Sequence, residues 1–261
     1  MKHNSFRIGL LAAALILVAI PALADTLIEK SEQTHPFPGG VFTLDNVNGS
    51  VEILSWDRPE VRIEAEKRVE GRSREAVESA MGRLEIEVSP SRDGLRVRTR
   101  YPNRGGNVIG WLSGSKTSAS VRYRITVPKQ AKVSIDTVNA SITAQGVEGG
   151  YELETVNGRI DVARGAGSLE ASTVNGGIRA ELLSTRGQLK LETVNGSVDL
   201  SVPRQIQADV HVSTVNGRIE SDLPLAGSEI GRRSLKGTIN GGGGIPIRIS
   251  TVNGSVRLGP S

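Results

Sequence analysis

The 261-residue sequence contains no cysteine and few aromatic side chains, with two Trp, three Tyr and three Phe. The absence of cysteine excludes disulfide bonds and a lipid-modified N-terminal cysteine. The shortage of aromatic rings disfavours the usual aromatic-lined ligand pocket, and any core must consist of Val, Ile, Leu and Ala. Glycine, in contrast, is abundant, with 31 residues where an average composition would give roughly 18.

After the first two dozen residues the sequence also lacks any long apolar run. At the start, Lys2 and Arg7 precede an uncharged apolar stretch, residues 8–20. This stretch ends shortly before Ala22-Leu23-Ala24. This stretch is shorter than the roughly 20 residues that a membrane-spanning helix needs. The pattern predicts a signal peptide, residues 1–24, cleaved after Ala24, with an uncleaved anchor as the alternative. We therefore expect an exported protein, in the periplasm or at the cell surface.

Neither sign of charge dominates the rest of the chain. The 32 basic and 28 acidic residues give a net charge of +4, and loss of Lys2 and Arg7 with the signal peptide leaves +2. Between residues 57 and 104 charges of both signs are interleaved, as in Glu64-Ala65-Glu66-Lys67-Arg68. This pattern is typical of a solvated surface and not of a basic stripe that follows a phosphate backbone. Nucleic acid is therefore not expected as a partner.

The dominant feature is an internal repeat of the tripeptide Thr-Val-Asn, which occurs six times between residues 137 and 253. Successive asparagines of these copies are 18, 18, 20, 21 and 37 residues apart, and the last interval is close to two periods. Glycine follows the asparagine except in the first copy, where Ala140 stands, and a variant occurs at residues 46–49. The predicted repeat corners are Asn48, Gly49, Asn139, Asn157, Gly158, Asn175, Gly176, Asn195, Gly196, Asn216, Gly217, Asn253 and Gly254.

Each repeat consists of two short alternating segments separated by turn residues. Leu153 and Thr155 share one face before an Asn-Gly corner, and Ile160 and Val162 share one face after it. Such alternation predicts strands. An antiparallel meander of Asn-Gly hairpins fits the pattern, but equivalent turns of a meander do not touch, whereas each residue of a solenoid stacks on its equivalent. The sameness of the repeats therefore favours an all-β fold, a right-handed parallel β-solenoid, since parallel crossovers have that hand.

Stacking at the ~4.8 Å strand spacing would place the corner asparagines in a ladder, each side-chain amide donating to the next one's oxygen. Glycine would supply the backbone angles of a tight corner. Leu153 and Ile160 differ in parity, so the corner must absorb one residue, and the sequence leaves open whether Val156 or Asn157 points inward. The expected interior consists of Leu153, Val156, Ile160, Val162, Leu169, Val174, Ile178, Leu189, Leu191, Val194, Val198, Leu200, Val210, Val212, Val215 and Ile219.

Residues 25–132 are less regular, and we expect them to cap the regular repeat solenoid of residues 133–261. Predicted strands cover residues 41–44, 51–54, 61–65, 84–88, 95–101 and 121–127. Residues 73–83 are predicted to form a short helix, because apolar residues recur there at helical spacing after Ser73, a plausible N-cap. A solenoid needs such an atypical end, since its last coil would otherwise expose a strand edge and the core.

The repeated Thr-Val-Asn-Gly-x-Ile units follow a Val-Pro-x-x-Ala-x-Val segment at residues 127–133. Together these motifs resemble the DUF4097 family of bacterial exported proteins, described as candidate adhesins and similar to head GIN domain proteins. The resemblance spans most of the chain after the predicted signal peptide. It implies a right-handed β-solenoid at the cell envelope and supplies no catalytic residues. The departure at Ala140 concerns only whether that coil needs a glycine corner.

Residues that could carry catalysis are scarce. His35 and His211 are the only imidazole bases after residue 24, and their separation disfavours a nucleophilic site and a zinc site. A pair of outward carboxylates about 5 to 9.5 Å apart could cleave a polysaccharide, but the acidic residues alternate with basic ones. We expect no enzyme, cofactor or metal, with a carbohydrate-active β-helix enzyme as the alternative. Its candidate acids are Glu154, Asp161, Glu170, Glu192 and Asp199.

Residues 103–119 combine four glycines with several apolar side chains. The segment could form a lid over one end of the solenoid. It could instead contact a partner or a membrane surface through Ile109, Trp111 and Leu112, and the sequence leaves both open.

These observations predict an exported, non-enzymatic envelope protein, an adhesin-like or scaffold β-solenoid that presents a binding surface. The expected partner is an envelope protein or polysaccharide, and a peripheral membrane contact is compatible with this prediction. An envelope-stress sensor or regulator is a further alternative. Neither the ligand nor the oligomeric state follows from the sequence.

Overall fold

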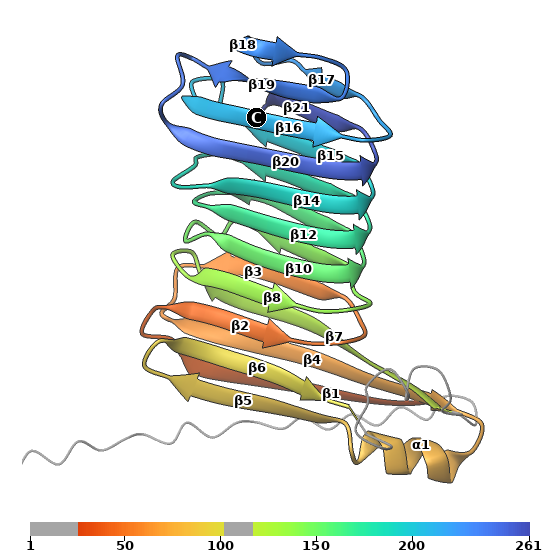
Figure 1. The fold of residues 1–261 in the computed structure, drawn as a ribbon. Coiled ribbons are helices and arrows are strands. Elements are labelled where there is room, and N and C mark those ends of the chain that lie inside the picture. Colours follow the sequence, from red (N-terminus) through yellow and green to blue (C-terminus); the bar gives the residue numbers. More distant parts are fainter. Residues whose placement is uncertain (1–25, 102–116) are drawn as a thin grey trace, which may run out of the picture.

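The computed structural model describes residues 26–101 and 117–261, which form two β-sheets that face each other and one short helix at one end (Figure 1). We call the ten-stranded sheet sheet A and the eleven-stranded sheet sheet B. In spatial order, sheet A consists of β1 (Thr26–Pro36), β4 (Glu60–Gly71), β7 (Thr117–Pro128), β3 (Val51–Trp56), β9 (Ile142–Gln145), β11 (Ile160–Gly165), β13 (Ile178–Leu182), β15 (Val198–Val202), β21 (Val256–Pro260) and β17 (Ile219–Ser221). Sheet B consists of β5 (Glu85–Ser91), β6 (Gly94–Arg100), β2 (Val41–Asp45), β8 (Lys132–Asp136), β10 (Tyr151–Asn157), β12 (Leu169–Asn175), β14 (Leu189–Asn195), β20 (Ile245–Asn253), β16 (Ala208–Thr214), β19 (Ser234–Ile239) and β18 (Leu225–Ile230).

Each regular coil contributes one strand to sheet B and the next strand to sheet A. Equivalent residues of neighbouring coils are direct partners: Leu153 faces Ala171 on the next strand, and Ala171 faces Leu191. All three side chains are buried between the sheets. The pairing is parallel throughout the regular coils, so the predicted parallel β-solenoid is confirmed and the meander of Asn-Gly hairpins is excluded.

The order of the coils in space departs from their order in the chain at two places. The coil β2–β3 lies between β6–β7 and β8–β9. The last coil, β20–β21, lies between β14–β15 and β16–β17. The 37-residue interval between Asn216 and Asn253 therefore contains no additional regular coil: it holds β17 and the β18–β19 hairpin. The sequence interpretation of that interval as two periods was wrong.

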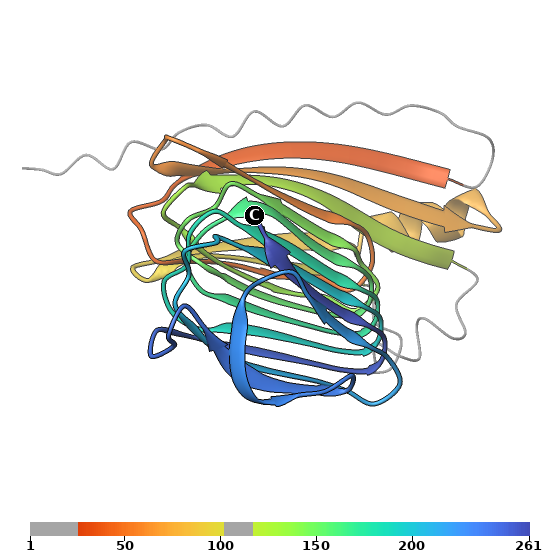
Figure 2. The same cartoon turned by 90° about the horizontal axis from the view of Figure 1, so that it is seen from above.

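Antiparallel elements complete both ends of the stack. At the N-terminal end the long strands β1, β4 and β7 pair antiparallel and project beyond the coils (Figure 2). The helix α1 (Arg74–Met81) packs on them through Val77, Ala80 and Met81, and Ser73 accepts a hydrogen bond from the Ala76 backbone N–H as the predicted N-cap. The predicted strand pair is present as β5 and β6. At the other end the β18–β19 hairpin pairs antiparallel with β16.

Candidate functional site

The threonine of each repeat is buried, and in five of the six repeats its hydroxyl donates to a carbonyl oxygen of the neighbouring coil. Thr173 Oγ1 donates to the Gly158 carbonyl oxygen at 3.0 Å, and Thr193 Oγ1 donates to that of Gly176 at 2.8 Å. Thr251 makes the same bond to Gly196. A buried carbonyl oxygen without a donor is costly, so this hydroxyl satisfies a group that the corner would otherwise leave without a partner.

The valine is exposed in five of the six repeats. The prediction that four of these valines lie in the core was wrong: Val156, Val174, Val194 and Val215. Because successive side chains of a strand point to opposite faces of the sheet, an inward threonine places the side chain of the next residue on the outer face. Neither Val156 nor Asn157 points into the core, and the corner before Ile160 absorbs the change of parity. We call the exposed row the valine stripe. In spatial order, its members are Val156 (39% exposed), Val174 (40%), Val194 (39%), Val252 (39%) and Val215 (55%).

The asparagines form the stacked ladder that the repeat predicts. Asn175 Nδ2 donates to Asn157 Oδ1 at 2.8 Å and accepts from Asn195 Nδ2 at 2.8 Å. All the amides donate in one direction, and the last one, on Asn48, donates to the Ala119 carbonyl oxygen at 3.3 Å. Hydrogen bonds aligned in a chain polarise one another. In spatial order, the asparagine ladder consists of Asn48, Asn139, Asn157, Asn175, Asn195, Asn253 and Asn216.

The corner glycines are required for a reason other than the predicted one. We expected them to supply unusual backbone angles, but of the corner glycines only Gly49 has a positive φ, +111°. At Gly176 an added Cβ would lie 1.9 Å from the Gly158 carbonyl oxygen. The same clash recurs at Gly158, Gly196, Gly217 and Gly254. Close approach of successive coils therefore excludes a side chain here. Ala140 supplies the carbonyl oxygen that Gly158 approaches.

The outer face of sheet A carries a row of charges that alternate in sign on both sides of one uncharged member, Thr143. Arg179 lies between Asp161 and Asp199, and Arg257 lies between Asp199 and Glu220. Opposite charges on neighbouring strands stabilise a sheet and fix its register. We call this set the alternating row; in spatial order it consists of Glu64, Arg124, Glu52, Thr143, Asp161, Arg179, Asp199, Arg257 and Glu220.

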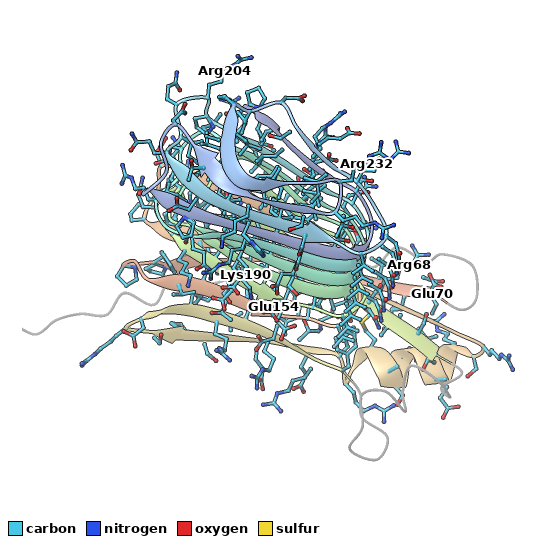
Figure 3. The ribbon with its side chains drawn as sticks, turned by 45° about the horizontal axis from the view of Figure 1, so that its top comes forward. Arg68, Glu70, Glu154, Lys190, Arg204 and Arg232 are labelled. Carbon is cyan, nitrogen blue, oxygen red and sulfur yellow. The ribbon has the colours of Figure 1, made fainter. Side chains whose placement is uncertain are left out.

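The five candidate acids do not share a face. Asp161 and Asp199 lie on sheet A, whereas Glu154, Glu170 and Glu192 lie on sheet B. Figure 3 shows Glu154 and Lys190 projecting from the outer side of sheet B. Lys190 Nζ binds Glu170 at 3.1 Å and Glu192 at 3.2 Å, and these hydrogen bonds raise the pKa of Lys190. These carboxylates are thus shared with a cation, as on an ordinary solvated face.

The grooves on the described surface include the following three. One of about 470 Å³ lies over β1, β4, β7 and β3, where Glu66 pairs with Lys30 and Arg122, each at 3.2 Å. Another, of about 600 Å³, lies over β11, β13, β15 and β21 of sheet A. The third, about 500 Å³, lies over β16, β18, β19 and β20 and includes His211. His211 is exposed on its strand, as predicted.

The sequence does not indicate that two basic side chains lie beside His211. Its neighbours Arg248 and Lys236 come from strands that follow later in the chain and pair with β16 on either side. Only the coil order brings them together, and no local pattern indicates that order. The predicted contact residues Ile109, Trp111 and Leu112 lie outside the described residues.

Within residues 26–101 and 117–261, no group of three or more His, Asp or Glu side chains is arranged to hold a metal ion. No helix in these ranges has both the length and the apolar character needed to cross a membrane.

Comparisons with known proteins identify a family and one solved structure with a shared fold. Residues 112–259 match the family described as Toastrack DUF4097. A candidate cell adhesion protein from Clostridium sporogenes ATCC 15579 superposes with a TM-score of 0.56 at 9% identity, over 90% of this chain and 100% of that chain. A candidate adhesin from Bacteroides fragilis NCTC 9343 gives a TM-score of 0.44 at 9% identity, over 88% and 97%. At such identities the first match shows a shared fold and nothing more. No curated protein matches the sequence.

Proposed function

The chain belongs to the Toastrack DUF4097 family, and on that premise we propose that it is an exported, non-enzymatic binding module of the cell envelope. The signal-peptide pattern of residues 1–24, which lie outside the described part of the chain, supports export and cleavage after Ala24. The adhesin descriptions of the structural neighbours are compatible with a role at the cell surface. The proposed partner is an envelope protein or polysaccharide.

The observation that carries this proposal is the valine stripe. Five valines in register, each 39–55% exposed, follow one another along sheet B beside the asparagine ladder. Single exposed apolar residues are ordinary, but contiguous apolar surface marks interaction sites. Repeat proteins bind through extended surfaces of this kind. The coils hold the stripe rigid, so little conformational entropy would be lost on binding.

The arrangement of the acids favours binding over polysaccharide cleavage. A glycosidase needs two carboxyl groups that flank the scissile bond, about 5 to 9.5 Å apart. Asp161 and Asp199 have Arg179 between them, and Glu170 and Glu192 share Lys190. The enzyme remains the alternative function. The sensor or regulator alternative predicts altered envelope-stress reporter output in a deletion strain and no saturable surface ligand.

One assay separates these functions. Residues 25–261 would be incubated with a panel of purified envelope polysaccharides and with detergent-extracted envelope proteins, and both retention and new reducing ends would be measured. We expect saturable retention that the double variant V174E/V194E loses. Leu183→Glu is the matched control, because Leu183 is exposed (52%) but lies off the stripe. New reducing ends or unsaturated products would overturn the proposal in favour of the enzyme.

A further inference from the structure

Three basic side chains lie side by side near the C-terminal end of sheet B. Arg248 on β20 is the register partner of His211 on β16, and His211 is the partner of Lys236 on β19. All three are exposed on the outer face. Figure 1 shows β20, β16 and β19 as consecutive strands at the blue end of the stack. We call these residues the basic row.

The basic row differs from the charge pattern of the same coil on sheet A. In the same coil, but on sheet A, Arg257 has an acid on each side: Asp199 and Glu220. Arg248 instead has Lys190 and His211 as its partners. Lys190 already forms ion pairs with Glu170 and Glu192. Arg248 and Lys190 are like charges directly opposite each other, which destabilises a sheet, so an anion bound beside Arg248 would offset part of this cost.

The basic row lies in a groove of about 500 Å³. Small residues, Ala226, Thr238 and Pro246, line the groove beside it. The volume falls in the range of small-molecule sites, about 300 to 1,000 Å³. The acid in this groove, Asp209, accepts a hydrogen bond from the Gly243 backbone N–H at 3.1 Å and so holds the neighbouring loop.

We propose that this groove binds a phosphate group carried by a sugar-sized molecule. Arg248 offers a planar fork of donors that matches a phosphate oxygen pair, and Lys236 adds a compact positive charge. His211, which lies between them, offers a ring N–H group as a further donor. Neighbouring strands are about 4.8 Å apart, so one tetrahedral oxyanion over His211 is within reach of both flanking cations. This site is separate from the valine stripe and does not depend on the proposed function.

Isothermal titration at low salt with glucose 6-phosphate, inorganic phosphate, glucuronate and glucose tests the proposal. We expect both phosphates to bind to the wild type and glucose not to bind. Arg248→Gln and Lys236→Gln should each weaken binding tenfold or more. Arg257→Gln, which removes a cation from the same coil on the opposite sheet, should leave binding unchanged. Absence of phosphate binding, an equal loss in Arg257→Gln, or tighter binding of glucuronate than of glucose 6-phosphate would overturn the assignment.

The substitution His211→Gln tests the part played by His211, which lies between Arg248 and Lys236. It should weaken the binding of inorganic phosphate severalfold. Unchanged phosphate binding in His211→Gln would exclude His211 from the site.

Discussion

Asn253 Nδ2 donates to Asn195 Oδ1 at 2.7 Å, across 58 residues of chain that include Asn216. Asn216 Nδ2 in turn donates to Asn253 Oδ1 at 2.8 Å. The last repeat of the chain is therefore an inner member of the ladder, and the repeat that precedes it in sequence lies outside it. Both edges of β20 are paired, with β14 and with β16, so this strand near the C-terminus is as enclosed as any in the solenoid.

Amide hydrogen exchange should show that β20 lies between two paired strands. Terminal segments usually fray and exchange first. Here we expect the β20 amides of Ile247, Ile249 and Thr251 to exchange as slowly as those of β14. The amides of β18, which pairs only with β19 among the described strands, should exchange faster. Exchange in β20 as fast as in β18 would contradict the observed coil order.

Asn175→Ala removes two consecutive bonds from the middle of the asparagine ladder. Asn175 is exposed, so water can replace part of what is lost, and we expect the free energy of unfolding to fall by about 0.5 to 1.5 kcal/mol. Chemical denaturation measures this change. Ser172→Ala, on the same strand but off the ladder, is the control and should change stability by less than about 0.5 kcal/mol. Equal effects of the two substitutions would show that the ladder contributes nothing.

Gly176→Ala should destabilise the protein although the backbone of Gly176 is not in the left-handed region. Its Cβ would lie 1.9 Å from the Gly158 carbonyl oxygen, and the two coils would have to separate. We expect a loss of about 1 to 3 kcal/mol, the usual cost of overpacking. Gly177→Ala is the neighbouring control, since its Cβ would lie 3.1 Å from the Ser197 carbonyl oxygen and should cost less. Thermal melting that ranks the two in reverse would refute close approach as the cause.

Arg179→Glu places a carboxylate between Asp161 and Asp199 in the alternating row. Two like-charge cross-strand pairs should lower stability by roughly 1 kcal/mol at low salt. Because Arg179 is exposed, 1 M NaCl should restore most of the loss. Arg179→Gln removes the cation without adding a negative charge and should show a smaller, weakly salt-dependent effect. If the loss of stability in Arg179→Glu did not depend on salt, altered packing and not charge repulsion would be its cause.

The three tyrosines predict a loss of stability in alkali. Burial raises the pKa of Tyr101 to about 12 and raises the pKa values of Tyr123 and Tyr151 as well. An unfolded chain releases these protons near pH 10, so above pH 10 the folded state holds more protons and stability falls as pH rises. Tyr101 alone should contribute about 1.4 kcal/mol per pH unit between pH 10 and 12. Denaturation curves at pH 9 to 11.5 measure the slope, which should become shallower in Tyr101→Phe; an unchanged slope would contradict the assignment.

The corner at Val156 and Asn157 shows which features the local sequence pattern predicts and which it does not. The sequence correctly predicts that Asn157 stacks on its equivalents and that the corner before Ile160 shifts the parity by one residue. It fails at Val156, because hydrophobicity alone assigns valine to the core. The threonine at position 155 takes the inner place since its hydroxyl reaches the Ala140 carbonyl oxygen at 3.0 Å, and that acceptor lies on another coil.

The sequence by itself determined the period, the two strands of each coil and the amide ladder, because these follow from alternation within a few residues and from like side chains stacking on like. Only the tertiary structure decided which coil lies next to which. The Thr-Val-Asn repeats present nearly identical edges, so local propensity does not distinguish β16 from β20 as the neighbour of β14. Long-range pairing makes that choice, and with it places Arg248, His211 and Lys236 in one row.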